Sequence, residues 1–331
     1  MVGLFHGCSG CYIGSHMALE LLDAGEDVTV IDNLSTGFRW AVPDRAKFVE
    51  GDIGDQALLR RVLAGDAIDA IIHFAGSIVV PESVANPLGY YLNNTCKSRS
   101  LIASAVEAKV PYFVFSSTAA VYGMPKQNPV GEDALLEPIS PYGTSKLMTE
   151  LMLRDTAKAH DFRYVALRYF NVAGADPQGR GGQSTENATH LIKVSCQTAI
   201  GGRPYLEVFG TDYPTPDGTC IRDYIHVTDL VRAHLDALRY LREGGKSEVL
   251  NCGYGSGFSV LDVIGSVKRV SQADFPVRMA PRRPGDPPVI VAKAARAGEV
   301  LGWTPRLNDL DTIVNHALSW EKRLRNYRAA S

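Results

Sequence analysis

Short apolar runs alternate with amphipathic segments along the first half of the chain. The apolar runs are rich in β-branched and aromatic residues, and they cover residues 27–32, 46–53, 67–76, 111–117 and 163–171. Between these runs, apolar residues recur at helical spacing over residues 13–24, 55–64, 82–108 and 142–159. Nearly continuous apolar strands that are joined by helices are typical of a parallel sheet with helices on both faces. The pattern therefore predicts an α/β fold built on a doubly wound parallel sheet.

The alternation becomes less regular after about residue 172. Two turn-rich segments, 174–190 and 210–220, interrupt it. The elements predicted in this part are helices over 187–200, 228–243, 259–272 and 309–327 and strands over 221–227 and 248–255. We therefore expect a nucleotide-binding domain over 1–172 and a smaller mixed α/β substrate domain over 173–331. Segments near 220–250 are candidates to rejoin the first sheet.

Composition and charge narrow the class of protein. Of the 331 residues, 45% are hydrophobic and 21% are charged, and the formal net charge is −2. These values are ordinary for a globular protein and give no overall basic field that would attract nucleic acid or an anionic membrane. No apolar stretch is long enough to span a bilayer and no signal peptide is visible, so we expect a cytoplasmic protein without membrane or nucleic-acid partners. The six scattered cysteines indicate reduced thiols rather than a disulfide scaffold.

The segment LFHGCSGCYIGSH (residues 4–16) has the form of a strand end, a glycine-rich turn and a helix start. Its glycines, Gly7, Gly10 and Gly14, would let backbone N–H groups approach a pyrophosphate at the helix N-terminus. Asp32 ends the next apolar run, 18 residues after Gly14, where a carboxylate can accept both adenosine ribose hydroxyls and would repel a 2′-phosphate. The segment therefore predicts a Rossmann-type sheet that binds NAD rather than NADP. An ordinary tight turn is the alternative.

Cys8 and Cys11 lie within this turn in a C-x-x-C arrangement. Such a pair at a helix start can lower the pKa of a thiol and support redox chemistry. A zinc site would need two further ligands, and His6 is the only donor close in sequence, so we expect no metal. The alternative is that two small side chains simply occupy turn positions.

The strongest chemical signal is SPYGTSK (residues 140–146). Ser140 suits a helix N-cap and Pro141 the first helical position, which places Tyr142 in the first turn and Lys146 one turn later on the same face. A free phenol has a pKa of about 10, but a nearby ammonium group and the positive helix end both favour the phenolate. The pair can therefore act as a general base at neutral pH. An exposed Tyr–Lys pair without function is the alternative.

The segment before this helix ends with hydroxyl side chains. Ser116, Ser117 and Thr118 follow the apolar run 111–117, at the strand end that borders the ligand crevice of an open α/β sheet. One of them could relay a proton between a substrate hydroxyl and Tyr142. Strand capping is the alternative for Ser116 and Ser117.

Taken in order, several motifs resemble the extended short-chain dehydrogenase/reductase family and, within it, the UDP-glucose 4-epimerases. The resemblance runs from about residue 2 to 325. The motifs are CYIGSH, DNLSTG, GDI, HFAG, SSTAAVYG, YGTSK, RYFNVAGA, FGTDYPTPDGTCIRDYIHV and APRRPGD. It implies interconversion of UDP-glucose and UDP-galactose by transient oxidation at C4, with tightly bound NAD as the cofactor and a UDP-sugar as the substrate.

The resemblance also implies roles for individual residues. The catalytic set corresponds to Thr118, Tyr142 and Lys146. The cofactor contacts correspond to Gly7, Gly10, Tyr12, Ile13, Gly14, Asp32, Asn33, Asp52, Ile53, Phe74, Ala75, Asn94, Ser116, Lys146 and Tyr169. The substrate contacts correspond to Thr118, Tyr142, Asn171, His190, Leu191, Phe209, Arg222, Tyr224, Arg283, Asp286 and Ile290. Helices 82–108 and 142–159 correspond to the pair that forms a homodimer, so we expect a homodimer.

The chain departs from the family pattern at the pyrophosphate loop, where His6 and Cys8 replace the usual residues and Cys11 is one residue extra. A non-catalytic, redox-sensing nucleotide-binding protein is therefore an alternative function, although a tuned phenol argues against it. Ala119 and Ala120 occupy the acid and base positions of 4,6-dehydratases, which argues against elimination chemistry. Ile290 is smaller than the tyrosine that some relatives carry, so we expect tolerance of a 2-N-acetyl group. Epimerisation of N-acetylated or pentose UDP-sugars remains an alternative.

Overall fold

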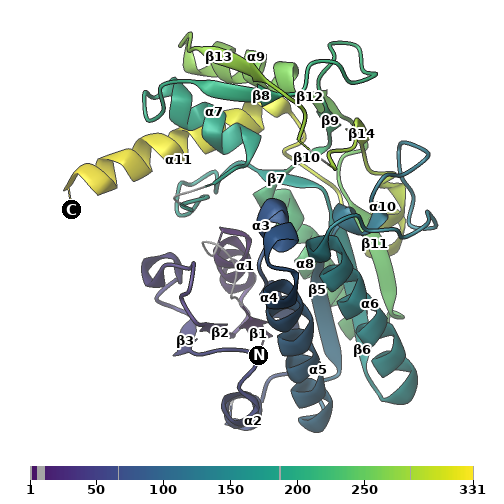
Figure 1. The fold of residues 1–331 in the computed structure, drawn as a ribbon. Coiled ribbons are helices and arrows are strands. Elements are labelled where there is room, and N and C mark those ends of the chain that lie inside the picture. The colour runs from purple at the N-terminus through teal and green to yellow at the C-terminus, as the bar shows by residue number, and fades with distance from the viewer. Residues whose placement is uncertain (1, 6–11, 66, 186–187, 284, 331) are drawn as a thin grey trace.

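The structure is a computed structural model that describes residues 2–5, 12–65, 67–185, 188–283 and 285–330. Its main sheet contains β1 (Val2–Phe5), β2 (Val28–Asp32), β3 (Lys47–Glu50), β4 (Ala70–His73), β5 (Tyr112–Thr118), β6 (Arg163–Tyr169) and β11 (Glu248–Cys252). The strand order is β11–β6–β5–β4–β1–β2–β3, and all neighbours run parallel (Figure 1). The predicted doubly wound Rossmann-type sheet is confirmed. Its order reverses between β1 and β4, where a crevice opens at the carboxyl ends of the strands.

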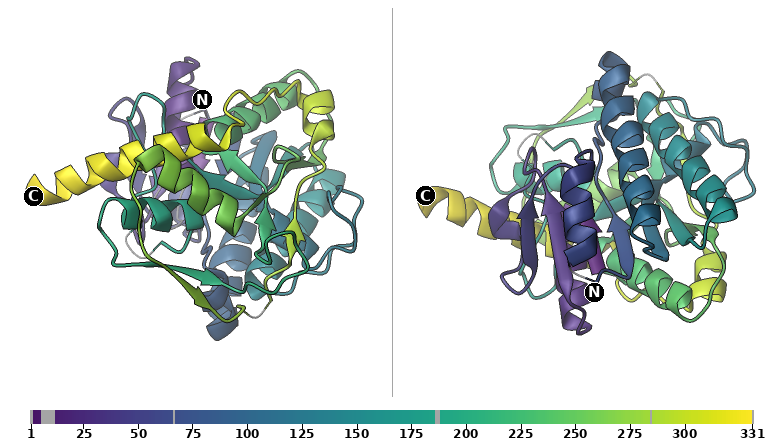
Figure 2. Two further views of the ribbon diagram at one scale, coloured as in Figure 1. Left: turned by 90° about the horizontal axis from the view of Figure 1, so that it is seen from above. Right: turned by 90° about the horizontal axis from the view of Figure 1, so that it is seen from below.

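Helices cover both faces of this sheet. One face carries α1 (Tyr12–Asp23), α8 (Val227–Arg242) and α10 (Ala295–Leu301). The other carries α2 (Gln56–Gly65), α5 (Lys97–Glu107) and α6 (Pro141–Ala159), which lie side by side when the molecule is viewed from below (Figure 2). Successive strand residues alternate between the two cores: Ile72 and Val114 pack with α8, whereas Ile71 and Phe113 pack with α2 and α5. Because both faces are buried, the strands read as continuous apolar runs.

The single helix expected over 82–108 is wrong. The chain there forms α3 (Val80–Ala85), α4 (Pro87–Tyr90), the π-helical turn η2 (Tyr91–Cys96) and then α5. Pro87 cannot continue α3, because it has no N–H to donate, and Asn86 caps the new helix by accepting from the N–H of Gly89 at 3.1 Å. The π-helical turn matters for the site, because it carries Asn94.

The rest of the chain forms a second group of elements. Its helices are α7 (Leu191–Ala199), α9 (Val260–Ser271) and α11 (Leu310–Ala330), which pack on one another and lie together when seen from above (Figure 2). Its small sheets are β10 (Tyr224–His226) with β7 (Asn171–Ala173), β12 (Phe258–Ser259) with β9 (Ile221–Arg222) and β14 (Val289–Ile290), and β13 (Val277–Ala280) with β8 (Leu206–Phe209). Two short 3-10 turns are η1 (Arg39–Ala41) and η3 (Ala119–Tyr122).

Two expected elements of this second part differ from the structure. The strand expected over 221–227 is divided into β9 and β10, because Asp223 lies between them and turns its carboxylate toward the backbone N–H groups of Tyr254, Gly255 and Ala292. The helix expected from residue 187 begins at Leu191. The chain beyond residue 226 adds α8, β11 and α10 to the layers of the main sheet. The division at residues 172 and 173 stays a prediction.

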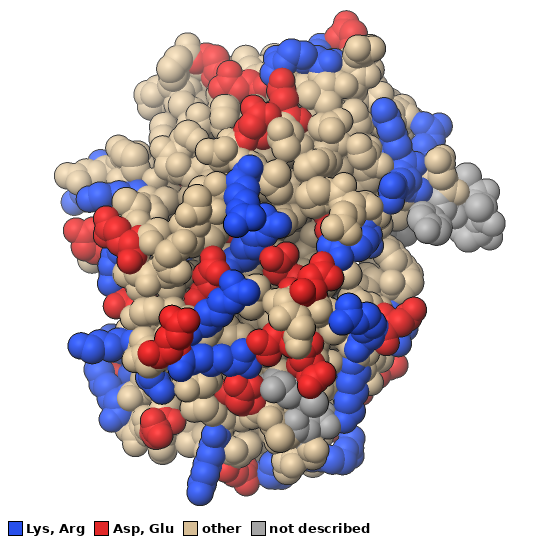
Figure 3. Space-filling view, turned by 180° about the vertical axis from the view of Figure 1, so that it is seen from behind, with Lys and Arg blue, Asp and Glu red and all other residues tan. Residues whose placement is uncertain are grey.

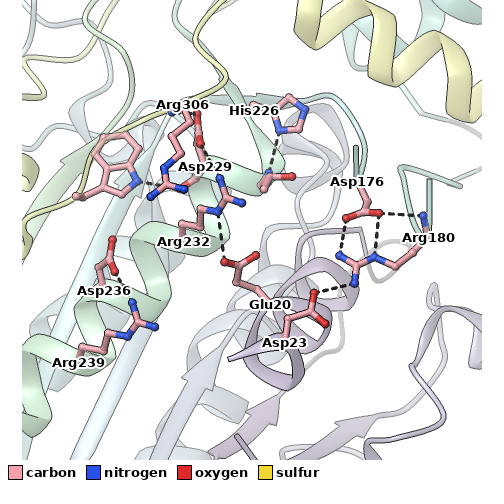
Figure 4. Close-up of polar contacts among 12 residues, drawn as sticks. Glu20, Asp23, Asp176, Arg180, His226, Asp229, Arg232, Asp236, Arg239 and Arg306 are labelled. Carbon is pink, nitrogen blue, oxygen red and sulfur yellow. Dashed lines mark hydrogen bonds and ion pairs between the residues drawn. The ribbon is translucent and has the colours of Figure 1, made fainter. Parts of the chain in front are cut away.

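Ion pairs connect α1 to later parts of the chain (Figure 4). Arg232 of α8 lies 3.3 Å from Glu20, and Arg180 lies 2.7 Å from Asp23 and 2.8 Å from Asp176. These pairs are partly exposed and contribute little stability individually, but they connect α1, the helix that follows the glycine-rich segment, to later parts of the chain.

Elsewhere, acidic and basic side chains are mixed over the face of the molecule that Figure 3 shows. Among the described helices, none has the length and apolar character that crossing a bilayer requires.

Candidate active site

The helix α6 begins at the wall of a large crevice. Ser140 accepts a 3.2 Å hydrogen bond from the N–H of Gly143, and Pro141 occupies the first helical position, as the sequence predicts. Tyr142 is 7% exposed at this wall, and Lys146 is 2% exposed one turn behind it. The Lys146 ammonium donates a 3.0 Å hydrogen bond to the backbone oxygen of Ser116. The helix therefore presents a phenol to the crevice and keeps a cation buried behind it.

The carboxyl end of β5 faces the same crevice. Thr118 lines the crevice, and its hydroxyl oxygen accepts from the N–H of Ala120 at 3.1 Å. The hydroxyl of Ser116 is buried and makes no hydrogen bond with the described residues. Ser117 donates its hydroxyl to Glu150 of α6 at 2.5 Å and is not part of the cavity lining.

One cavity of about 800 Å³ brings most of the predicted site residues together, and this volume suits a small-molecule ligand. Every predicted substrate residue lines it: Thr118, Tyr142, Asn171, His190, Leu191, Phe209, Arg222, Tyr224, Arg283, Asp286 and Ile290. The predicted cofactor residues in its wall are Tyr12, Ile13, Gly14, Phe74 and Tyr169. The following described cofactor residues are not part of its lining: Asp32, Asn33, Asp52, Ile53, Ala75, Asn94, Ser116 and Lys146. The predictions for Gly7, Gly10, Cys8 and Cys11 lie outside the described residues.

The predicted adenosine end lies at the carboxyl ends of β2 and β3. Asp32 is almost fully buried and accepts a 2.7 Å hydrogen bond from the N–H of Leu34. Asp52 accepts hydrogen bonds from Lys97 at 2.6 Å and from Asn33 at 3.1 Å. Burial acts to raise the pKa of the Asp52 carboxyl, but the hydrogen bonds from Lys97, the Gly54 N–H and Asn33, together with the charge of Lys97, outweigh burial and leave that pKa lowered. Lys97, to which the sequence analysis gives no role, therefore lies at this predicted end of the site.

Both the oxygen and the nitrogen of the Asn94 side-chain amide form hydrogen bonds with other protein groups. Its oxygen accepts from the N–H of Ser77 at 2.7 Å, and its nitrogen donates to the Ser77 carbonyl at 2.9 Å and to the Ser145 hydroxyl at 3.0 Å. Asn94 therefore connects the loop after β4 to α6, immediately beside Lys146. This arrangement makes it a support for the site, and the direct cofactor contact implied by the sequence stays a prediction.

The opposite end of the cavity carries aromatic and cationic side chains. The Arg283 guanidinium lies 3.8 Å from the centre of the Phe209 ring, and Arg222 lies 3.7 Å from the Asp286 carboxylate. Burial raises the pKa of the Tyr224 phenol, so this group stays protonated and can donate a hydrogen bond. Two forked guanidinium groups beside an aromatic face can hold a diphosphate and a planar base.

Two buried ion pairs next to the cavity were not predicted. Lys193 of α7 pairs with Glu321 of α11 and also donates to the Gln183 carbonyl at 2.6 Å. Glu150 of α6 pairs with Arg168 of β6 at 2.6 Å. The spacing of Tyr142, Lys146 and Glu150 at intervals of four is a signal that could have identified Glu150, whereas Lys193 and Glu321 are too far apart in sequence for any pattern to join them. Within the described ranges, no group of three or more His, Cys, Asp or Glu side chains could hold a metal ion.

Comparison with known proteins agrees with this geometry. A sequence model of the NAD dependent epimerase/dehydratase family matches residues 6–253. The chain is 58% identical over 313 residues to a UDP-glucose 4-epimerase of Azospirillum brasilense, covering 95% of this chain and 90% of that protein. The crystal structure of UDP-glucose 4-epimerase from Brucella ovis in complex with NAD superposes with a TM-score of 0.92 at 45% identity, covering 96% of this chain and 98% of that one. The UDP-Glc/GlcNAc 4-epimerase of Campylobacter jejuni superposes with a TM-score of 0.84 at 46% identity, covering 97% and 99%.

Proposed function

The chain belongs to the NAD dependent epimerase/dehydratase family, and from this premise we propose that it interconverts UDP-glucose and UDP-galactose by transient oxidation at C4. Because its relatives are UDP-glucose 4-epimerases, one of them crystallised with NAD, the chain is an NAD-dependent isomerase. The observation that carries the residue assignment is the shared cavity, whose wall includes Tyr142 and Thr118 together with Phe209, Arg222 and Arg283. A proton acceptor and a diphosphate-binding end in one cavity are what this reaction requires.

Tyr142 is the proposed base and acid. Its phenolate takes the proton of the sugar 4-hydroxyl, directly or through the hydroxyl of Thr118, and later returns that proton to the C4 oxygen of the turned 4-keto sugar. Thr118 is suited to this relay, because its oxygen already accepts from Ala120 and its hydrogen can turn toward the cavity. Lys146, held on the Ser116 carbonyl, keeps positive charge behind the phenol and thus favours its ionised form.

The residues present fit NAD. Asp32 offers a buried carboxylate at the carboxyl end of β2, and the unpartnered hydroxyl of Ser116 lies at the end of β5 near the switch point of the sheet. When bound, NAD would act as the reversible acceptor of the C4 hydride. Tyr12, Ile13, Gly14 and Phe74 would line its site on the cavity side. The Asp32 carboxylate would exclude the 2′-phosphate of NADP.

The UDP part of the substrate would bind at the other end of the cavity. We assign Arg222 and Arg283 to the diphosphate and Phe209 to the uracil ring, because their guanidinium groups and aromatic face meet there. Such anchoring at the diphosphate leaves the sugar free to turn over between the two hydride transfers. That rotation is what allows a single base to serve both faces of the sugar.

A second activity, on N-acetylated UDP-sugars, is supported by Ile290. Its side chain lines the cavity, where a tyrosine would fill more of the space beside the sugar. The Campylobacter jejuni protein, 46% identical, is described as acting on both UDP-Glc and UDP-GlcNAc. The pentose alternative stays open. The redox-sensor alternative has no support in the described residues, because Cys8 and Cys11 lie outside them.

We further propose a homodimer and a cytoplasmic location. Exposed apolar side chains gather on α3, α4, η2 and the adjacent α6: Val84, Leu88, Leu92, Met148 and Leu151. A second copy of the chain would cover them.

The proposed cytoplasmic location is supported by the cysteines. The described ones, Cys96, Cys196, Cys220 and Cys252, are all unpaired, which suits a reducing compartment.

The direct test is a coupled assay of UDP-galactose conversion by the purified protein, without added NAD, alongside Tyr142→Phe. We expect turnover by the native chain and a loss of at least about 100-fold in the variant. The Tyr164→Phe variant, in which the phenol lost lies in β6 away from the cavity, serves as the control. Native-level turnover by Tyr142→Phe would remove Tyr142 from the mechanism, and inactivity of the native chain would refute the function.

A further inference from the structure

One face of α6 contacts two successive residues of β5. Tyr142, Lys146 and Glu150 are spaced by one helical turn and therefore share this face. Lys146 donates to the Ser116 carbonyl at 3.0 Å, and Glu150 accepts from the Ser117 hydroxyl at 2.5 Å. The two bonds, made one turn apart, determine how α6 lies along the end of the strand.

The Glu150 carboxylate is itself held from the neighbouring strand. Arg168 of β6 donates Nε to Oε1 at 3.0 Å and a terminal nitrogen to Oε2 at 2.6 Å, and both side chains are 5% exposed. Ser117 and Arg168 are paired across β5 and β6, so their side chains leave the sheet on the same face and meet at one carboxylate. The fork geometry of the guanidinium leaves Glu150 little freedom to move.

The same network reaches the turn after Thr118. Arg168 donates to the Tyr122 hydroxyl at 3.0 Å, and Tyr122 donates to the Asn251 amide oxygen at 2.6 Å. Burial raises the pKa of Tyr122 to about 12, so its phenol remains a donor. Tyr122 ends η3, the turn that begins directly after Thr118. The network therefore holds the chain on both sides of Thr118 and holds the helix that carries Tyr142 and Lys146.

We propose that Ser117, Glu150 and Arg168 are positioning residues for the C4 oxidation, which set the register of α6 against β5 and thereby place Tyr142 and Lys146 opposite Thr118. The inference rests on the proposed function. Neither Ser117 nor the ion pair lines the cavity, so these residues act through the groups that do. Misplacing reacting groups by about 1 Å can cost about 100-fold in rate, so a small shift of α6 would be seen in turnover.

The Ser117→Ala variant tests this with the least disturbance, because it removes one hydrogen bond and leaves the Glu150–Arg168 pair intact. We expect kcat for UDP-galactose to fall about tenfold while KM changes less than about twofold, because the diphosphate end is untouched. Ser117→Thr keeps a hydroxyl and should restore most of kcat. The matched control is Ser266→Ala in α9, which also removes a buried serine that donates to a carboxylate, that of Asp311 at 2.6 Å. It should leave kcat unchanged.

The outcomes separate this inference from the proposed function. Glu150→Gln serves as a second variant, and we expect it to lower kcat more than Ser117→Ala does. If Ser117→Ala and Glu150→Gln both lower the melting temperature but keep the native kcat, the network is only structural and the inference is overturned. If Ser117→Thr is no more active than Ser117→Ala, the hydroxyl is irrelevant and the inference also falls. Absence of turnover in the native chain would instead overturn the proposed function.

Discussion

Lys146 reaches from the second turn of α6 to the backbone oxygen of Ser116 and donates a 3.0 Å hydrogen bond to it. The ammonium is thereby fixed on the strand end while Tyr142 faces the cavity. We predict that Lys146→Met lowers kcat by about 100-fold or more, because the phenol loses the charge that favours its ionised form. Steady-state kinetics of UDP-galactose conversion would measure this loss.

Lys158→Met is the control for this prediction. Lys158 lies near the end of the same helix and is 71% exposed, and its ion pair among the described residues is with Asp155, which is also exposed. Its replacement should leave kcat and KM at native values. Native turnover by Lys146→Met would contradict the assigned role, and equal losses in both lysine variants would indicate a general effect on α6.

Ile290 leads to a prediction about substrate range. Its side chain lines the cavity, so the native chain should convert UDP-N-acetylgalactosamine as well as UDP-galactose. Ile290→Tyr should reduce the N-acetyl activity by at least about tenfold relative to UDP-galactose activity, since the larger side chain takes up the space of the acetyl group. Comparing kcat/KM for the two substrates measures the ratio, with Ile290→Leu as the variant of similar size. A native chain that converts UDP-galactose fast and the N-acetyl sugar not at all would refute the prediction.

The sheet and its helices could be predicted because they depend on local periodicity. Strands buried on both faces appear as continuous apolar runs, and the cap formed by Ser140 and Pro141 marks the start of α6 within one residue. The expectation failed where a single residue overrode the pattern. Pro87 divides the helix expected over 82–108, and Asp223 divides the strand expected over 221–227.

The residues that hold the candidate site in place were harder to predict from the sequence than the residues that line its cavity. Motifs identify Tyr142 and Lys146, because their chemistry depends on their spacing in one helix. The pairing of Glu150 with Arg168, by contrast, requires α6 and β6 to be docked first, and Asn94 shows its contacts only once the π-helical turn has placed it beside Ser145. A motif can therefore identify candidate reactive groups, whereas the contacts that hold these groups in place appear only in the folded chain.

The buried pair of Lys193 and Glu321 yields a stability prediction. The two side chains are 3% and 6% exposed and join α7 to α11. Glu321→Gln should lower the free energy of unfolding by about 3–5 kcal/mol, because it removes the carboxylate that pairs with the buried Lys193 ammonium. Urea denaturation would measure the change. The double variant Lys193→Met with Glu321→Met should lose much less, and exposed Glu299→Gln should lose nothing. A double variant as unstable as the single one would show that packing, not charge, dominates.

The fully buried His226 predicts how stability depends on pH. Its Nδ1 accepts from the N–H of Thr228 at 3.0 Å as the cap of α8, and its Nε2 lies 2.9 Å from Nδ1 of His316. Burial, helped by the positive charges of His316, His16 and Arg232 and opposed by Asp176, lowers the pKa of His226 to about 3. In the unfolded chain the pKa returns to about 6.5, so between these values only the unfolded chain binds the proton.

Stability should therefore fall as the pH drops from 7 toward 5, and His226 alone should contribute about 2 kcal/mol of that fall. The variant His226→Asn keeps an oxygen that can cap α8 but cannot titrate, so its free energy of unfolding should decline less over the same range. Urea titrations of both proteins at pH 7 and pH 5 measure the difference, and exposed His160→Asn is the control that should retain the native slope. Equal slopes for the native chain and His226→Asn would show that other groups bind the proton, and the buried neutral histidine at the start of α8 would then have no part in the acid response.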